Sequence, residues 1–145
     1  MGWKAHMDAI ERCSLADLEP LMAVIEDDDT LSDDFMAPHE RPGSFWFWIP
    51  EQACACLWKP GNRSKTYRLS HVYVRPEARG EGMGKALLMY RLLFAKKLPD
   101  CETVDTLFIH NPSTYYELGF RLVDVRGEDN SIHHMERSVD AEEDI

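Results

Sequence analysis

The sequence is short of basic residues and long apolar runs, and each shortage excludes a class of protein. Sixteen lysines and arginines stand against 26 acidic residues, which gives a net charge of −10. A protein that neutralises nucleic-acid phosphates needs a basic surface, so this balance argues against nucleic-acid binding. The longest apolar run, Ala53–Trp58, is far below the roughly 20 residues that span a membrane. We therefore expect neither nucleic-acid nor membrane partners.

Cysteines are also few, and they are scattered. Cys13, Cys54, Cys56 and Cys101 fit neither a disulfide framework nor the paired spacing of a zinc site. Cys54 and Cys56 alternate with alanines, which is typical of small buried strand residues. No apolar leader is visible at the N-terminus. These features predict a cytoplasmic protein with reduced thiols and no metal.

The length and the placement of charge add two expectations. A chain of 145 residues predicts one domain, taken as residues 1–138, followed by an acidic, flexible tail over 139–145. Residues 59–85 carry seven basic and two acidic side chains, which favours an anionic ligand there. The first 34 residues carry ten acidic and two basic side chains. Their cluster Glu26–Asp29 fits either a cationic acceptor or a solvated helix end.

Hydrophobic spacing predicts two main helices. One follows Ser14, with Pro20 kinking it or delaying its start, and the stronger one covers Gly82–Leu98. A short helix or turn is expected over Asn111–Leu118. Apolar and alternating runs predict strands at Ala5–Ile10, Phe45–Ile49, Ala53–Trp58, Tyr67–Val74, Val104–Ile109, Phe120–Val125 and Ile132–Val139. This order predicts an α+β fold with one parallel crossover and a terminal antiparallel pair.

The most informative motif is Arg79-Gly80-Glu81-Gly82-Met83-Gly84, between a predicted strand and the stronger helix. Glycines leave backbone N–H groups uncovered, and with the helix dipole behind them these groups suit a pyrophosphate. The spacing matches neither the dinucleotide fingerprint GxGxxG nor the phosphate loop GxxxxGK[ST].

The run Val72–Gly84 closely resembles the acetyl-CoA signature of the GNAT superfamily of N-acetyltransferases, in which a strand ending V-x-P precedes [Q/R]-x-x-G-x-[G/A]. Tyr115–Phe120 resembles the family's Y-x-x-L-G-F motif. The resemblance implies a GNAT fold of three α/β layers. Its mixed, mostly antiparallel sheet is splayed between the fourth and fifth strands and flanked by helices. Exposed strand edges in this fold often pair, so we expect a homodimer.

The resemblance also implies roles for individual residues. Backbone groups of Val72 and Val74 would bind the pantetheine arm and the acetyl carbonyl, and Tyr115 would protonate the departing thiolate. The pyrophosphate would be bound by Arg79, Gly80, Gly82, Met83, Gly84 and Lys85. Asn111 stands where a coenzyme-contacting asparagine often begins the second motif. It is only four residues before Tyr115, about one helical turn closer than is common in the family. Either this helix is shortened or Asn111 is not the usual asparagine.

The chemistry of acyl transfer is consistent with the same reading. A backbone N–H near Val74 could polarise the thioester carbonyl, and no covalent enzyme intermediate is needed. His71, beside Val72, has the ordinary pKa of a general base, but it could equally be a packing residue. Ordered water with an N-terminal acid is the alternative base. We expect an acetyl-CoA-dependent N-acetyltransferase acting on a primary amine of a small molecule or protein. The alternative is a catalytically weak module that binds CoA or a partner protein.

Overall fold

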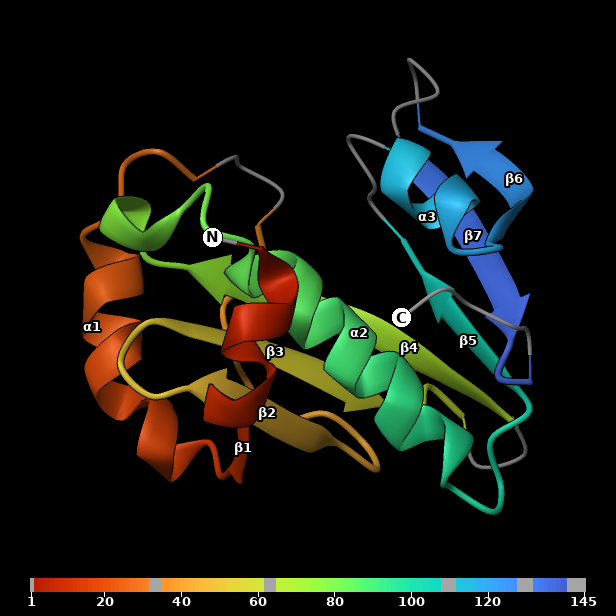
Figure 1. Ribbon diagram of the computed structural model, residues 1–145, viewed down its shortest axis with the longest axis horizontal. Coiled ribbons are helices and arrows are strands. Elements are labelled where there is room, and N and C mark those ends of the chain that lie inside the picture. Colours follow the sequence, from red (N-terminus) through yellow and green to blue (C-terminus); the bar gives the residue numbers. More distant parts are fainter. Residues whose placement is uncertain (1, 32–34, 62–64, 108–111, 128–131, 141–145) are drawn as a thin grey trace.

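The structure, a computed structural model, describes residues 2–31, 35–61, 65–107, 112–127 and 132–140. Its centre is a seven-stranded sheet in the order β1-β2-β3-β4-β5-β7-β6. Among these strands β4 and β5 pair in parallel, and every other neighbouring pair is antiparallel (Figure 1). The strands are β1 (Glu11–Cys13), β2 (Phe45–Ile49), β3 (Ala53–Trp58), β4 (Thr66–Val74), β5 (Thr103–Thr106), β6 (Arg121–Arg126) and β7 (Ile132–Ser138). The expected mixed, mostly antiparallel sheet is confirmed.

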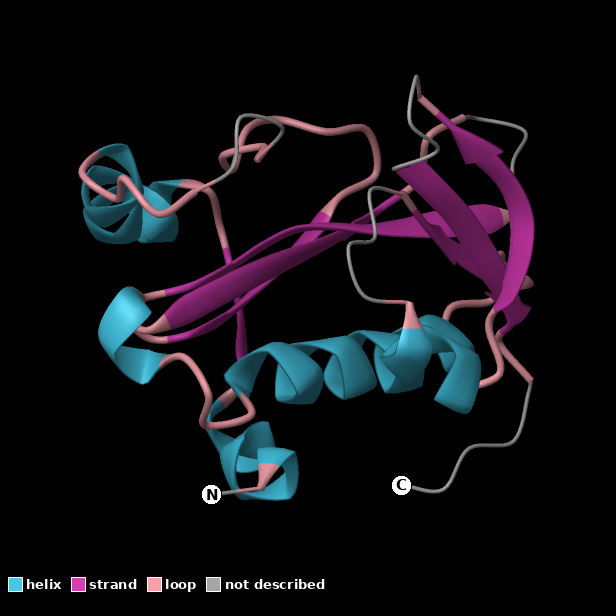
Figure 2. Cartoon of the chain, turned by 90° about the horizontal axis from the view of Figure 1, so that it is seen from above, coloured by secondary structure: helices cyan, strands magenta, loops and turns pink. Residues whose placement is uncertain are grey.

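Helices cover both faces of this sheet. On one face lie α2 (Met83–Lys96), α3 (Ser113–Glu117) and the 3-10 helix η1 (Trp3–Ala9). On the other lies α1 (Glu19–Glu26), so the predicted three-layer α+β architecture is confirmed (Figure 2). Two single turns, η2 (Ala16–Leu18) and η3 (Pro76–Ala78), precede α1 and α2.

The inner strand β3 is buried on both faces. Successive side chains of a strand point to opposite faces. Ala53, Ala55 and Leu57 therefore join the core under α2, and Cys54, Cys56 and Trp58 join the core under α1. A strand covered on both sides appears in the sequence as an unbroken apolar run. The expectation that Cys54 and Cys56 are small buried residues is confirmed.

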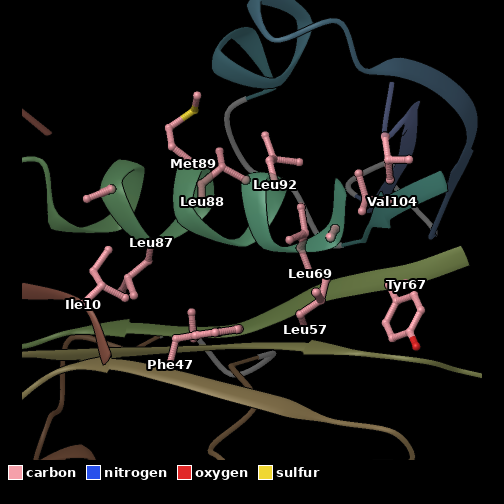
Figure 3. Packing of buried hydrophobic residues seen from close by; sticks show 14 of the residues in the cluster. Ile10, Phe47, Leu57, Tyr67, Leu69, Leu87, Leu88, Met89, Leu92 and Val104 are labelled. Atoms are coloured by element: carbon pink, nitrogen blue, oxygen red, sulfur yellow. The ribbon is translucent and has the colours of Figure 1, made fainter. Parts of the chain in front are cut away.

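The core under α2 fixes the start of that helix relative to the sheet. Figure 3 shows Leu87 of α2 pointing toward Ile10 and Phe47, and Leu92 of the same helix near Val104 of β5. Leu87, Phe47 and Val104 are fully buried. Because α2 begins at the glycine-rich turn, this packing also holds that turn against the sheet.

The helix expected after Ser14 starts late, at Glu19, which is one of the two outcomes expected from Pro20. The Ser14 N–H donates to Asp17 Oδ2 at 2.9 Å, and the Asp17 N–H donates to Ser14 Oγ at 3.2 Å. This reciprocal pair caps the single turn η2. Pro20 then occupies the first turn of α1, where its missing N–H leaves no hydrogen bond unmade.

The strand predicted over Ala5–Ile10 is wrong, because this segment forms η1. Its turns are closed by Ala5 N–H to Gly2 O at 3.2 Å and Ile10 N–H to Met7 O at 3.3 Å. The ring of His6 also hydrogen-bonds Glu81 O at 2.8 Å, which ties η1 to the glycine-rich turn. A contact so distant in sequence leaves no local pattern, and the first strand begins only at Glu11.

Two chain segments end differently from the expected ranges. β5 covers Thr103–Thr106, whereas the predicted strand ran to Ile109, and residues 108–111 lie outside the described part of the chain. Val139 is buried, and its N–H donates to Glu102 O at 3.0 Å. The folded part therefore extends past residue 138, and residues 141–145 of the expected tail are not described.

Replacing Leu87 by alanine should lower the free energy of unfolding by about 2–5 kcal/mol, because it deletes a buried side chain and leaves a cavity. Urea denaturation followed by circular dichroism measures the loss. Leu122→Ala makes the same deletion on β6, where the side chain is 40% exposed, and should cost well under half as much. Equal losses in the two variants would contradict the described core.

Candidate active site

One extra residue interrupts the pairing of β4 with β3. Ser70 pairs with Cys56 and Tyr73 pairs with Cys54, so two residues of β4 lie opposite a single residue of β3. The first of the two, His71, has φ 57°, in the left-handed region that residues other than glycine rarely adopt. This is a β-bulge, a feature that redirects side chains and is frequent beside active sites.

The bulge changes which face of the sheet each residue of β4 meets. Leu69 packs in the core under α2, whereas Tyr73, four residues on, packs in the core under α1. In a regular strand these two residues would share a face. Within the bulge, Val72 is exposed and His71 is buried.

The parallel pairing of β4 with β5 is short. It runs from Thr66 opposite Thr103 to Leu69 opposite Thr106, and the described part of β5 offers no partner to Ser70–Val74. Beyond Leu69 the two strands diverge (Figure 1). The expected splay between the fourth and fifth strands is confirmed. It leaves the bulge, Val72 and Val74 on an edge that β5 does not cover.

The glycine-rich turn connects the end of β4 to α2. Gly80 has φ 83° and Gly82 has φ 91°, and Gly82 is the N-cap of α2. A Cβ added at Gly80 or Gly84 would meet nothing within 4 Å, so the backbone is open there. A Cβ at Gly82 would lie 2.8 Å from the backbone nitrogen of Trp3. Gly82 is therefore needed for the packing of η1, a reason that the motif alone does not reveal.

Arg79 is held by protein groups. Its Nε donates to Val74 O at 2.9 Å, Nη1 to Thr30 Oγ1 at 2.8 Å and Nη2 to Asp28 Oδ2 at 2.8 Å. The Tyr73 hydroxyl also donates to Asp28 Oδ2, at 2.7 Å. Hydrogen bonds from Thr30, Tyr73 and Arg79 hold the pKa of Asp28 well below its ordinary range. The guanidinium thus joins the turn to the segment after α1.

Other residues of the predicted phosphate site lie at the start of α2. Met83 packs against the core, and Lys85 places its Nζ 5.7 Å from the centre of the Trp3 ring. Lys4 approaches the same ring at 5.6 Å. The open backbone at Gly84 therefore has the cation of Lys85 next to it in the chain.

Tyr115 lies on α3, the short helix before β6. Its ring meets that of Phe120 edge-on at 5.2 Å, and its carbonyl accepts the Phe120 N–H at 2.9 Å. Tyr115 is half-buried against the core under α2, whereas its neighbour Tyr116 is exposed. Asn111 lies outside the described residues, so its expected contact with the coenzyme stays a prediction.

His71 is a buried imidazole with one nitrogen engaged. Its Nδ1 contacts Ser70 Oγ, while Nε2 has no partner among the described residues. Burial, and next the electrostatic effects of His39, Arg41 and Arg91, lower the pKa of His71 to about 4. The imidazole is therefore neutral at pH 7, and its basicity is weak.

Arg91 is a polar residue of the site that helical periodicity misses. The side chain is 1% exposed and points into the sheet, where Nη1 donates to Cys56 O at 2.9 Å and Nε to Leu87 O at 3.1 Å. No carboxylate of the described residues pairs with it. Burial lowers the pKa of Arg91, and Tyr115 is the strongest of the groups that oppose this shift. Arg91 therefore lies electrostatically close to both the bulge and Tyr115.

A family model described as "Acetyltransferase (GNAT) family" matches residues 7–120. The chain belongs to this family. The match includes the glycine-rich turn, the bulge, Arg91 and the Tyr115–Phe120 motif, and it ends before β6. The resemblance that the two motifs indicated is thereby confirmed. No curated protein sequence matches the chain.

Solved structures share the GNAT fold at low sequence identity. ElaA from Escherichia coli has a TM-score of 0.67 and 20% identity, over 88% of this chain and 97% of that one. The ribosomal-protein-S18-alanine N-acetyltransferase from E. coli has a TM-score of 0.66 and 17% identity, over 92% of this chain and 95% of that one. N-acetylglutamate synthase from Neisseria gonorrhoeae, complexed with coenzyme A and L-arginine, has a TM-score of 0.64 and 16% identity, over 91% of this chain and 33% of that one. At these identities the likeness shows the fold.

We also searched the described part of the chain for metal clusters, membrane-spanning helices and further cavities. It contains no cluster of three histidine, cysteine or acidic side chains that could hold a metal. None of its helices is long and apolar enough to cross a membrane. A cavity of about 640 Å³ lies near the start of β5 and the end of β7, and its lining includes Glu102, Arg121 and Glu136. It contains none of the predicted site residues.

The contacts of Asp28 predict how acid destabilises the protein. Because its folded-state pKa is lowered, its contribution is fully present above the unfolded value of about 3.9 and is lost as the pH falls. Asp28→Asn should therefore lose less stability than the wild type between about pH 5 and pH 2, measured by urea denaturation at each pH. Asp8→Asn, an exposed change on η1, should behave like the wild type. Parallel curves for all three proteins would contradict the ion pair.

Proposed function

We propose that the protein is an acetyl-CoA-dependent N-acetyltransferase that transfers the acetyl group directly to a primary amine. The observation that carries this proposal is the β4 bulge at the point where β5 leaves the sheet, beside the open backbone of Gly80 and Gly84. Membership of the GNAT acetyltransferase family supports it. A structural neighbour that carries coenzyme A supports the choice of donor.

The donor would lie along the uncovered edge of β4. Backbone groups of Val72 and Val74 would bind the pantetheine arm and polarise the acetyl carbonyl, which needs fixed N–H donors directed at the developing oxyanion. The pyrophosphate would meet the N–H groups of Gly80 and Gly84 and the start of α2, with Lys85 nearby. Arg79, with its three hydrogen bonds, would shape the turn more than contact phosphate.

Direct transfer fits the state of the cysteines. Burial raises the pKa of Cys54 and Cys56 to about 12 and that of Cys101 to about 11. Almost none of these thiols is ionised at neutral pH, and the thiolate is the form that attacks. The amine itself would therefore attack the thioester.

Tyr115 would donate a proton to the sulfur of coenzyme A as the C–S bond breaks. A positioned hydroxyl is suited to this role as a general acid. Arg91 would stabilise the negative charge that develops in this region, because its guanidinium is buried and has no carboxylate partner among the described residues. The two residues come from α3 and α2, on opposite sides of the splay.

The geometry of His71 argues against its role as the general base. A histidine whose pKa is about 4 and whose Nδ1 is already occupied by Ser70 is a poor proton acceptor at pH 7. We propose that His71 acts through its free Nε2 as a hydrogen-bond donor. The amine would lose its proton through water.

A second candidate function has one observation in its favour. Edge strand β6 exposes Leu122, Val123 and Val125, an apolar strip that suits a second protein or a second copy of this chain. A catalytically weak module that binds CoA and a partner would use this strip. Binding of acetyl-CoA without turnover of any amine would favour it over the enzyme.

Calorimetric titration with acetyl-CoA and with CoA should show saturable binding of both. Gly84→Asp should weaken that binding roughly tenfold or more, because it places a carboxylate beside the pyrophosphate. The same change should raise protein stability slightly, since an acid near a helix N-terminus contributes about 0.3–1 kcal/mol. Gly84→Asn is the matched control of equal size and should bind CoA more tightly than Gly84→Asp. Equal CoA affinity of the two variants would contradict the placement of the pyrophosphate at this turn.

Tyr115→Phe should leave CoA affinity unchanged and lower turnover by about 10²-fold, the lower range for loss of a general acid. Release of free thiol, followed with a panel of amines, measures turnover, and calorimetry measures affinity. Tyr116→Phe, on the exposed neighbour, is the control and should keep wild-type activity. Full activity in Tyr115→Phe would remove this hydroxyl from the mechanism.

A further inference from the structure

Several buried nitrogen atoms on the α1 face of the sheet, Trp48 Nε1 among them, lack a hydrogen-bond partner among the described residues. Three belong to residues that lie together: Arg41 Nε from the segment before β2, Trp46 Nε1 on β2 and His71 Nε2 in the bulge. Trp46 and His71 are each 5% exposed. We call these three residues the donor cluster. Buried polar groups are nearly always paired, so three unpaired ones together point to a missing partner.

Ring contacts bring the members of the donor cluster together. The Trp46 and His71 rings lie 5.5 Å apart, and the His39 ring lies 4.9 Å from His71. Arg41 donates from Nη1 to His39 Nε2 at 3.2 Å and stacks 3.8 Å from the centre of the Trp58 ring. The cluster thus brings together side chains from three segments of the chain.

The hydrogen bonds around the two histidines bear on which nitrogens carry protons. Trp58 Nε1 donates to Ser70 Oγ at 2.8 Å, and Ser70 Oγ also contacts His71 Nδ1. When the Ser70 hydroxyl donates to Nδ1, the proton of His71 is on Nε2, the unpaired atom. His39 donates from Nδ1 to Ala37 O at 2.9 Å and accepts from Arg41 at Nε2. With this tautomer of His71, all three unpaired nitrogens are donors.

The charge of the donor cluster is positive. Arg41 forms no ion pair with a carboxylate of the described residues, and its guanidinium is partly buried on Trp58. Two buried acids on this side of the sheet already have cationic partners: Asp105 is held by Arg68 at 2.9 Å and His134 at 2.9 Å, and Asp28 by Arg79 at 2.8 Å. A group of N–H donors with one positive charge suits an oxygen anion.

We propose that the donor cluster binds the carboxylate of the acetyl acceptor, which is then an amino acid or a similar small molecule carrying both an amine and a carboxylate. The inference rests on the proposed function, and it names the acceptor class. His71 directly precedes Val72, so a carboxylate held here keeps a nearby amine within reach of the thioester at the bulge. A cationic acceptor was one of two interpretations of the acidic cluster Glu26–Asp29, the other being a solvated helix end, and Asp28 of that cluster is bound to Arg79.

The test uses the side-chain N–H signals of Trp46 and Arg41 in two-dimensional NMR spectra of the ¹⁵N-labelled protein. N-acetylglycine, which has an amide and a carboxylate, is the probe, and N-acetylglycinamide is its uncharged control. We expect saturable shifts of both signals with the acid and far smaller shifts with the amide. Equal shifts with the two compounds, or no shift with the acid well above millimolar concentrations, would overturn the proposal.

A pair of variants separates a specific site from a general effect of charge. Arg41→Gln should weaken N-acetylglycine binding about tenfold, since it removes a charge-assisted contact. Arg126→Gln makes the same change in net charge on β6, next to its partner Asp124, and should leave binding unaltered. Wild-type affinity in Arg41→Gln would overturn the proposal. The NMR titration needs no turnover. Failure of the acetyl-CoA titration would therefore reject the enzymatic function, whereas the carboxylate site is tested separately by the shifts with N-acetylglycine.

Discussion

His71 occupies a backbone conformation that costs about 1–3 kcal/mol for a residue other than glycine, and the contacts around it hold it there. Ser70 and Trp58 fix its Nδ1, the ring of Trp46 packs against its face, and Arg91 binds the carbonyl of Cys56 on the neighbouring strand. The bulge that results sends the side chains of β4 to the opposite face from that point on. The exposure of Val72 and the place of His71 in the donor cluster depend on this one extra residue, on an edge that the short pairing with β5 leaves uncovered.

Arg91 links the bulge to the other side of the splay. Burying a guanidinium without a carboxylate is expensive, and main-chain carbonyls compensate only part of the lost hydration. Arg91 contributes to lowering the pKa of His71 at the bulge, after burial, His39 and Arg41, and it interacts electrostatically with Tyr115 in α3. One buried cation is therefore coupled to residues on both sides of the splay.

The sequence predicted correctly the elements that depend on residues close together in the chain. The hairpin over Phe45–Trp58 and the helix after Gly82 are set by turn residues and apolar spacing, so the sequence was sufficient for them. η1 was mistaken for a strand because its hydrogen bond to Glu81 and its packing on Gly82 are long-range. Arg91 was missed because periodicity assigns a charged residue to the solvent side of a helix. The bulge leaves little signal either, since histidine is enriched among the non-glycine residues at positive φ but such residues remain uncommon, so His71 alone does not mark a bulge.

The charge of the whole chain is a poor guide to the charge of the site. The net charge of −10 arises largely from the first 34 residues, whose acidic cluster Glu26–Asp29 fitted either a cationic acceptor or a solvated helix end. In the folded chain the acid nearest the turn, Asp28, accepts from Arg79, Thr30 and Tyr73 and so has little capacity left for a ligand. Beside the bulge, the unpaired side-chain atoms of the described residues include Trp46 Nε1 and Arg41 Nε, which are N–H donors, and Arg41 is a cation. Because electrostatic attraction in a partly dry site depends on the nearest unpaired groups, an acidic protein can still select an anionic end of its substrate.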